Sequence, residues 1–127
     1  ATDLAVYMQM LLNGGEYAGK NYIDSTTIQQ FTSTQYPLNN NRKAIGFDKP
    51  MMDKDEEGPS AKAASSDSYG HSGFTGTIAW ADPDNQSIFV FLSNRVHPDA
   101  SNRKLITKDI RTKIHSVLYE AIQELNN

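Results

Sequence analysis

The sequence predicts an α+β fold in which helices at both ends of the chain enclose a small antiparallel sheet. Three observations predict it: an amphipathic stretch near the N-terminus, two β-rich runs joined by a turn, and a long amphipathic stretch at the C-terminus. The chain has 127 residues, about one average domain, and its 38% of apolar residues can support a core. We expect a single unit with helices in 1–35, an irregular region in 36–67, and strands plus a closing helix in 68–127.

The first predicted helix covers residues 1–13. Thr2 is suited to be its N-cap, and Gly14 and Gly15 should end it, because glycine takes the left-handed conformation without a Cβ penalty. A second, short helix is expected from residue 24 or 25 to residue 31. The apolar face of the first helix consists of Leu4, Tyr7, Met8, Leu11 and Leu12.

The middle of the chain, residues 36–67, is expected to be irregular. Residues 36–43 are polar and rich in turn formers, and residues 44–48 are compatible with one short strand. Residues 51–67 are polar, with glycine and proline, and are long for a loop inside a compact domain. Such loops usually signal function or mobility.

A hairpin is the clearest feature of the sequence. Residues 75–81 alternate between apolar and polar types, and residues 87–92 are rich in β-formers. Between them, residues 82–85 (Asp-Pro-Asp-Asn) have turn chemistry. The second run is almost continuously apolar, so we expect its strand to be covered on both faces.

The last predicted element is one helix over about residues 101–125, with Ser101 as its N-cap. Its apolar stripe is expected to lie across the sheet. The stripe consists of Ile106, Ile110, Ile114, Val117, Ala121 and Leu125, with Leu118 and Ile122 beside them.

Composition excludes several classes of function. A net charge of −3 is too mild for an acidic tail or a nucleic-acid binder, and the basic residues of 103–113 share their helix with acidic ones. Zero cysteines exclude disulfides and thiolate zinc sites. No apolar run is long enough to cross a membrane. Gly70, Gly73 and Gly76 lack dinucleotide spacing, so no cofactor is expected.

No metal site is expected either, because the three histidines are far apart in the sequence. Residues 53–58 imitate the start of a calcium loop, but Ala64 occupies the position of the bidentate glutamate, and prolines at 50 and 59 exclude the flanking helices. A solvated acidic loop is the better interpretation, and a small calcium-binding domain is the weaker alternative.

Nucleophilic catalysis needs a nucleophile beside a base. The chain holds one Ser-x-x-Lys match, Ser101 to Lys104, in a stretch where Ser101 is better explained as a helix N-cap. No Tyr-x-Asn occurs. We therefore expect no nucleophile in this chain.

The most informative segment is the glycine-rich run 69–77, Tyr-Gly-His-Ser-Gly-Phe-Thr-Gly-Thr, followed by the hairpin and by residues 92–98. Glycine weakens strands, so three in seven residues mark a place where something approaches the backbone closely. The region resembles the C-terminal portion of the penicillin-recognising serine hydrolases, which include class C β-lactamases, D-Ala-D-Ala carboxypeptidases and esterases. The resemblance spans nearly the whole chain and is weakest over 36–67. It rests on the His71-Ser72-Gly73 triplet, Phe74-Thr75-Gly76, the Trp80 strand, the Asp82-Pro83 turn, Asn94-Arg95-Val96-His97-Pro98, the closing helix, and the opening Asp3-Leu4-Ala5 and Met10 to Gly15.

The resemblance implies one wall of an active site. His71 would be the polar group that faces the substrate carboxylate and the proton network of the nucleophile. Ser72 would hydrogen-bond the substrate carboxylate or amide, and Gly73 would keep the strand open for an acyl substrate. The backbone N–H of Phe74 would be one oxyanion donor, worth about 3 kcal/mol.

Asn94 and Arg95 are expected at the rim of the same site. Histidine in place of the family's lysine titrates near neutral pH, and resembles the peptidase and esterase branches. The family's nucleophile and tyrosine motifs lie upstream of the region that this chain resembles, so the chain is expected to be a partial domain, inert alone.

The resemblance also implies partners and a location. The parent protein would take a small-molecule or peptidoglycan-type substrate in the periplasm or cell envelope, and the missing N-terminal part of the domain would be a partner of this chain. Exposed sheet edges and apolar faces predict association, as a homo-oligomer or swapped dimer. The alternative is a non-catalytic module, appended to a larger enzyme, that serves docking or cell-wall binding.

Overall fold

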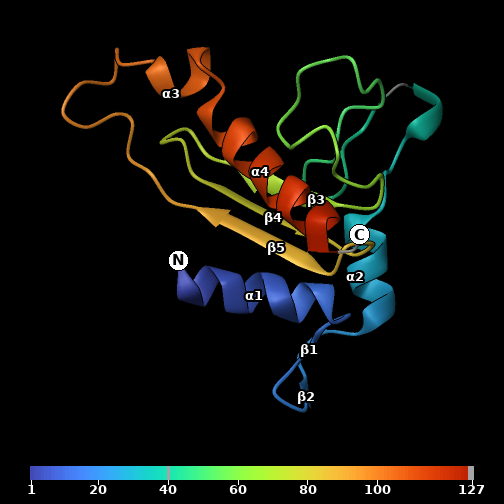
Figure 1. Ribbon diagram of the computed structural model, residues 1–127. Helices are drawn as coiled ribbons and strands as arrows, with labels where there is room; N and C mark the ends of the chain where they lie inside the picture. The colour runs from blue at the N-terminus through green and yellow to red at the C-terminus, as the bar shows by residue number, and fades with distance from the viewer. Residues whose placement is uncertain (40, 126–127) are drawn as a thin grey trace.

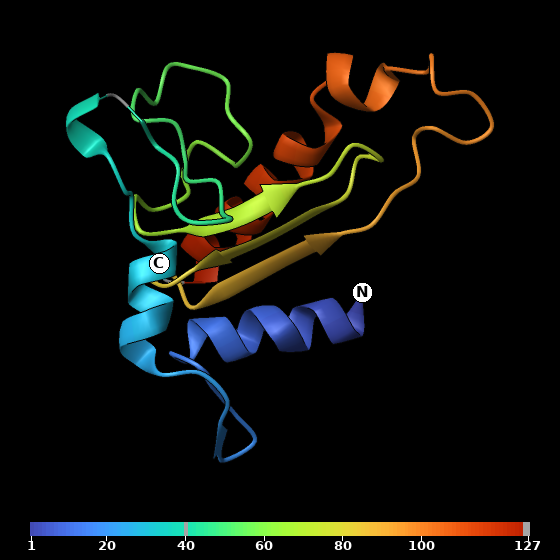
Figure 2. The same cartoon turned by 180° about the vertical axis from the view of Figure 1, so that it is seen from behind.

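The structure is a computed structural model that describes residues 1–39 and 41–125. Its centre is an antiparallel sheet in the order β3-β4-β5, formed by β3 (Tyr69–Ser72), β4 (Ile78–Asp82) and β5 (Ser87–Phe91). Helix α1 (Thr2–Leu12) packs on one face and helix α4 (Ile110–Leu125) on the other (Figures 1 and 2). The α+β class is therefore confirmed.

The two faces of the sheet follow from its register. Ala81 pairs with Ile88, and both pack with Met8 and Leu11 of α1. The next pair along β4 and β5 is Trp80 with Phe89, which points to the opposite face, where α4 lies. Strand β5 thus has an element on each face, as its apolar sequence predicts, although its residues are only half-buried.

The two N-terminal helices form as predicted, except for the cap of the first. Helix α1 begins at Thr2, and Ala1 occupies the N-cap position with no side-chain hydrogen bond, so the prediction of a Thr2 cap was wrong. Gly14 and Gly15 have φ values of +68° and +100°, the left-handed conformation expected after a helix end. Helix α2 (Ser25–Thr32) follows. Between the helices lies a small hairpin, β1 (Glu16–Tyr17) and β2 (Lys20–Asn21), which we did not predict.

Residues 44–48 do not form the predicted strand. Gly46 adopts φ +75°, and the Ala44 N–H donates to the Phe47 carbonyl, so the chain turns where an extended run was expected. Only Asp48 pairs, in an isolated bridge to Gly70. The rest of 36–67 is irregular apart from a 3₁₀ turn, η1 (Pro37–Asn39), as predicted; Asn40 lies outside the described residues.

The long segment 51–67 is held by the chain's own contacts. Ala61 and Ala64 are buried against Tyr119 of α4, and the Lys54 ammonium donates to the Ala64 carbonyl at 2.7 Å. A polar loop can therefore be ordered here, because a few small apolar residues anchor it to the core.

The C-terminal helix is broken into two, contrary to the prediction of one helix. Helix α3 (Lys104–Thr107) and α4 are separated at Asp109, whose φ of +51° cannot continue a right-handed helix. Ser101 is not a helix N-cap: Arg103 occupies that position, and the hydroxyl of Ser101 donates to Asp99 at 2.7 Å.

The predicted stripe of α4 faces away from the sheet. On the side of α4 that faces the sheet, His115 and Tyr119 are buried. On the outward side, Val117 is 60% exposed and Leu125 is 86% exposed. The apolar pattern pointed to the wrong face because the two side chains that fill the core on the sheet side are a histidine and a tyrosine, whose polar atoms are hydrogen-bonded to partners from distant segments. Leu118 and Ile122, expected beside the stripe, are half-buried.

Candidate active site

The candidate site lies along the outer edge of β3, since β4 covers only the other edge. Gly70 exchanges two backbone hydrogen bonds with Asp48, at 2.7 and 3.1 Å, so its N–H and C=O point outward. Backbone groups alternate along a strand in the direction they point. The N–H and C=O of Ser72 therefore point to the same outer edge, beyond the end of the Asp48 bridge. This leaves a short open edge over residues 71–73.

The predicted triplet is accessible from solvent. His71 is exposed, and Ser72 and Gly73 are half-buried. His71 pairs with Ala79 on the face that α1 covers, whereas Ser72 pairs with Ile78 on the opposite face. The imidazole makes no hydrogen bond within residues 1–39 and 41–125. A ligand that contacts both side chains must therefore lie along the edge between the faces.

A tight turn follows the triplet. The Gly73 N–H donates to the Thr77 carbonyl at 2.8 Å, and the Gly76 N–H donates to the Gly73 carbonyl at 3.0 Å, with Gly76 at φ +97°. The backbone N–H of Phe74 donates to no acceptor among the described residues. The turn thus presents a free main-chain donor immediately after the open edge, where the resemblance places the oxyanion donor.

Arg95 holds this turn in place. Its Nε donates to the Phe74 carbonyl at 2.8 Å, its guanidinium lies 4.5 Å from the centre of the Phe74 ring, and its own N–H donates to Thr75 at 2.9 Å. The structure therefore brings Arg95 to Phe74. Asn94 precedes it in the chain and is exposed. The roles of both residues toward a substrate stay predictions.

The glycine at the start of the run has a structural explanation. A Cβ on Gly70 would lie 2.2 Å from the Ala79 carbonyl oxygen and 2.4 Å from the Trp80 ring. The close approach that the glycines indicate is thus made, at this position, by the protein's own tryptophan. Gly73 differs, because a Cβ there would meet only the Thr77 side chain, at 2.6 Å.

A buried polar network supports the sheet from the α4 side. The Asp82 carboxylate accepts hydrogen bonds from the Tyr119 hydroxyl and the Ser65 hydroxyl, both at 2.6 Å, and from Asn85 and the Asp84 N–H at 3.0 and 3.1 Å. Burial works to raise the pKa of Asp82, but these hydrogen bonds outweigh it and hold the pKa below its usual value. The same burial and hydrogen bond raise the pKa of Tyr119.

His115 lies beside this network as a neutral side chain. Its ring stacks on Phe89 at 4.5 Å between centroids, and its Nδ1 accepts the Ala61 N–H at 3.2 Å. Burial lowers its pKa to about 4, against a smaller opposing effect of Asp82. Sequence reasoning missed this network, because its members come from four separated segments and match no motif.

Basic residues secure the Asp48 bridge. Lys43 pairs with the Asp48 carboxylate, and Arg42 lies 3.5 Å from it. Arg42 also donates to the Lys49 carbonyl at 2.6 Å, and the buried Lys49 donates to the Asp67 carbonyl at 2.8 Å. Burial lowers the pKa of Lys49. These contacts fix the point at which the open edge of β3 begins.

The other candidate chemistry is not assembled. Ser101 is exposed and bonds to Asp99, three residues before a four-residue helix, so Ser101 and Lys104 do not share a helical turn. In the described parts of the chain, no group of three or more His, Asp or Glu residues could hold a metal ion. Among the same residues, no helix is long and apolar enough to span a bilayer.

This geometry defines a class: an α+β unit whose open edge strand carries a His-Ser-Gly triplet and a free main-chain donor, like the wall of a penicillin-recognising serine hydrolase. Residues 1–112 match the protein family described as β-lactamase, so the chain belongs to the family of serine β-lactamases and related penicillin-binding-type hydrolases.

Relatives and a solved structure agree with this family. Proteins of Salmonella gallinarum (strain 287/91) and Salmonella typhi, each named "Putative D-alanyl-D-alanine carboxypeptidase", are 36% identical over 104 residues, 81% of this chain. The chain spans 23% of the length of each. A β-lactamase structure from Mycobacterium bovis has the same fold, with a TM-score of 0.64 at 19% identity, over 95% of this chain and 43% of that chain.

Proposed function

We propose that this chain supplies the β3 wall of the active site in a serine hydrolase that works by acyl transfer. The substrates would be D-amino-acid peptides, β-lactams or small esters. The observation that carries the proposal is the open edge over residues 71–73, which ends at the free N–H of Phe74. The family and the name of the Salmonella relatives favour D-alanyl peptides within this range.

The wall would bind substrate by main-chain pairing. An extended acyl substrate would lie along the outer edge, where the Ser72 N–H and C=O point, and its reacting carbonyl oxygen would reach the Phe74 N–H. That donor would stabilise the negative charge that develops when a serine attacks the carbonyl, by about 3 kcal/mol. His71, exposed beside this edge, would meet the substrate carboxylate and the proton network of the nucleophile.

The nucleophile would come from outside this chain. A serine activated by a lysine would attack the substrate carbonyl and form an acyl-enzyme, which water then hydrolyses. Because the chain spans 23% of its curated relatives, we propose that it is the C-terminal part of a longer polypeptide that holds these groups upstream of Ala1. Substrates of this class lie in the cell envelope, so we propose that location for the parent protein.

The first test is activity of the chain alone. We expect no turnover of a chromogenic cephalosporin or a p-nitrophenyl ester by the purified 127-residue chain. Steady turnover that is lost in Ser101→Ala would contradict the proposal, because it would place the nucleophile in this chain.

The second test uses the longer polypeptide encoded by the gene upstream of Ala1. A Ser-x-x-Lys motif with a Tyr-x-Asn between it and Ala1 is expected there. In that protein, His71→Ala should lower kcat/KM by about 100-fold or more, whereas His97→Ala, an exposed histidine outside the edge, should leave it unchanged. Absence of both upstream motifs would favour the alternative, a non-catalytic module for docking or cell-wall binding.

A further inference from the structure

The outward face of α4 is an apolar surface that the proposed function does not use. Ile110, Ile114, Val117, Ala121 and Leu125, here called the outer stripe, follow one another along this face. Ile114 is 42% exposed and Val117 is 60% exposed. In Figure 1, α4 lies in front of the sheet and no other helix or strand covers it. Large apolar side chains arranged in a line on an exposed face mark an interaction site.

The spacing of the outer stripe is that of a helix-pairing seam. Its first four members are 4, 3 and 4 residues apart, the heptad pattern that places one apolar line against a second helix. Lys113 and Glu120 flank this line, and both are exposed. They lie seven residues apart, about 10 Å along the helix, too far to pair with each other in one helix.

Neither flanking charge has a partner in its own chain. Within the described residues, the ion pairs involve only Arg42, Lys43 and Asp48. A basic residue thus flanks the stripe nearer its start and an acidic residue flanks it nearer its end, each one free to meet a charge on another molecule. Charges at these flanking positions set the choice and orientation of the partner helix.

We propose that the outer stripe pairs with the outer stripe of a second copy of this chain, with the two α4 helices antiparallel about a two-fold axis. In this register Ile114 faces Val117 of the second copy and Ile110 faces its Ala121, and the two-fold axis repeats both contacts. Lys113 then lies within about 3 Å, along the helix axis, of Glu120 of the second copy. The contact is symmetric, so two such ion pairs form.

Charge decides the orientation. In a parallel pairing the Lys113 side chains of the two copies would lie on opposite sides of the seam, as would the two Glu120 side chains, so Lys113 and Glu120 would not meet. The antiparallel pairing brings Lys113 and Glu120 of the two copies to the same side and matches opposite charges. A second apolar surface is a groove of about 250 Å³ between α1 and α2, lined by Tyr7, Phe31 and Phe47 among others. No charged side chain lines that groove, so nothing there selects a partner.

This pairing is independent of the catalytic proposal, and it is tested on the 127-residue chain itself. Sedimentation equilibrium between 10 µM and 1 mM should show a reversible dimer, because a seam of one 16-residue helix per chain gives a weak interface. Lys113→Glu and Glu120→Lys should each weaken dimerisation by about tenfold or more, since each turns two attractive pairs into repulsive ones. The double variant Lys113→Glu/Glu120→Lys should restore the dimer to within about threefold.

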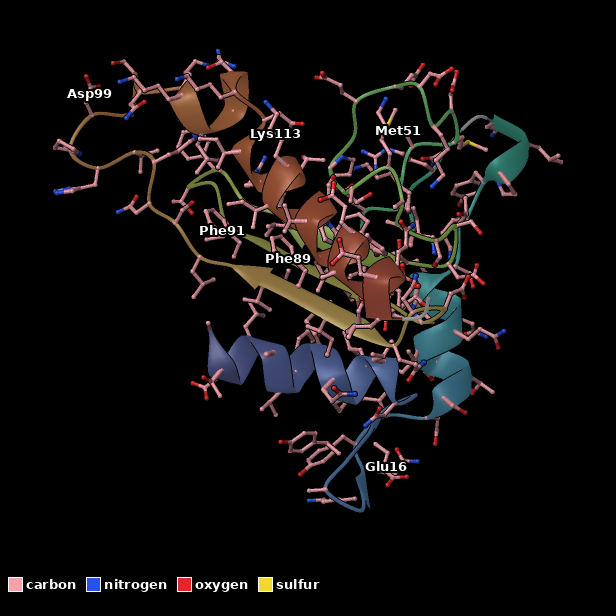
Figure 3. All side chains as sticks on the ribbon, in the orientation of Figure 1. Glu16, Met51, Phe89, Phe91, Asp99 and Lys113 are labelled. Carbon is pink, nitrogen blue, oxygen red and sulfur yellow. The ribbon has the colours of Figure 1, made fainter. Side chains whose placement is uncertain are left out.

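A matched control lies far from the stripe. Figure 3 shows Glu16 at the end of the molecule opposite to Lys113, so Glu16→Lys should leave dimerisation unchanged. Val117→Glu, at the centre of the stripe, should abolish it. Circular dichroism verifies that each variant is folded; the substituted side chains are exposed, so folding should be retained.

Three results would overturn the proposal. One is a chain that stays monomeric at 1 mM, which would instead point to another segment of a longer polypeptide as the cover of this face. The second is a dimer that Val117→Glu does not weaken. The third is a double charge variant that is as weak as the single ones, because the charges would then not face each other.

Discussion

Removing one hydroxyl group, in Tyr119→Phe, tests whether the buried network on the α4 side stabilises the fold. The Tyr119 hydroxyl donates to the Asp82 carboxylate at 2.6 Å, and Tyr119 is only 3% exposed. The substitution keeps the ring and its packing against Ala61 and Ala64. It therefore isolates the hydrogen bond from the apolar contacts.

The expected loss can be worked out from these contacts. A hydrogen bond to a charged group contributes about 1.5–3 kcal/mol to stability. Asp82 keeps its donors on Ser65, Asn85 and Asp84, so the carboxylate is not left without partners and the loss should lie near 2 kcal/mol. At a urea m-value of about 1.5 kcal/mol per M, the midpoint of unfolding should fall by about 1.3 M.

Urea denaturation followed by circular dichroism measures this shift. Tyr22→Phe is the matched control, because Tyr22 is 57% exposed; it should change stability by less than about 0.5 kcal/mol. An unchanged m-value in both variants verifies that the midpoint reports stability. If Tyr119→Phe and Tyr22→Phe unfold at the same urea concentration, the network does not stabilise the fold as argued.

Three further perturbations test other parts of the structure. Burial lowers the pKa of His115 from 6.5 to about 4, so the unfolded chain binds a proton at a higher pH than the folded chain does. The free energy of unfolding should therefore drop as the pH falls from 6.5 to 4, by up to about 1.4 kcal/mol per pH unit. The His115→Gln variant should lack this pH dependence. Arg95→Ala removes the bond to the Phe74 carbonyl, and amide hydrogen exchange in the turn 74–77 should become about tenfold faster. Gly70→Ala forces a Cβ against the Trp80 ring and should cost about 2 kcal/mol in thermal or urea unfolding.

Each of these has a control and an outcome that contradicts it. His97→Gln should keep the pH slope, and a slope that persists in His115→Gln would show that another group causes it. Arg103→Ala, an exposed cation, should leave exchange in the turn unchanged. A Cβ at Gly19 would meet no atom within 4 Å, so Gly19→Ala should lower the free energy of unfolding by about 1 kcal/mol, from its φ of +75° alone. An equal loss of stability in Gly70→Ala and Gly19→Ala would refute the packing argument.

Local patterns predicted the elements whose residues are set by near neighbours. Helix α1 and helix α2 form where periodicity placed them, and so does the β4–β5 hairpin, although β4 begins at Ile78 and not at residue 75 as predicted. The failures occur where one residue's backbone overrides the pattern. Gly46 turns the chain within the expected strand 44–48, and Asp109 breaks the expected long helix. The presence of a glycine or an aspartate at one position does not by itself predict that this residue adopts a positive φ.

The direction in which α4 faces could not be predicted from apolar residues. The stripe from Ile110 to Leu125 has the stronger apolar pattern. His115 and Tyr119 are nevertheless the side chains of α4 that lie in the core, because partners from distant segments form hydrogen bonds with their polar atoms. The burial of a polar side chain depends on tertiary hydrogen bonds, which spacing along one helix does not contain.

The candidate site was predicted mainly by an ordered set of short motifs. The sequence placed His71 to Phe74 at the start of the sheet, and the structure adds that this stretch forms an open edge and that Arg95 holds its turn. The roles of His71, Ser72, Gly73 and Asn94 toward a substrate stay predictions.

The bridge between Asp48 and Gly70 has a consequence for aggregation. An unpaired strand edge is a template on which further chains can add without limit, as in fibrils. Because Asp48 occupies the first part of this edge and Lys43 holds it there, only a few residues remain free. A short peptide can dock on such a length, whereas a cross-β stack that grows from this edge of the sheet finds too little backbone to continue.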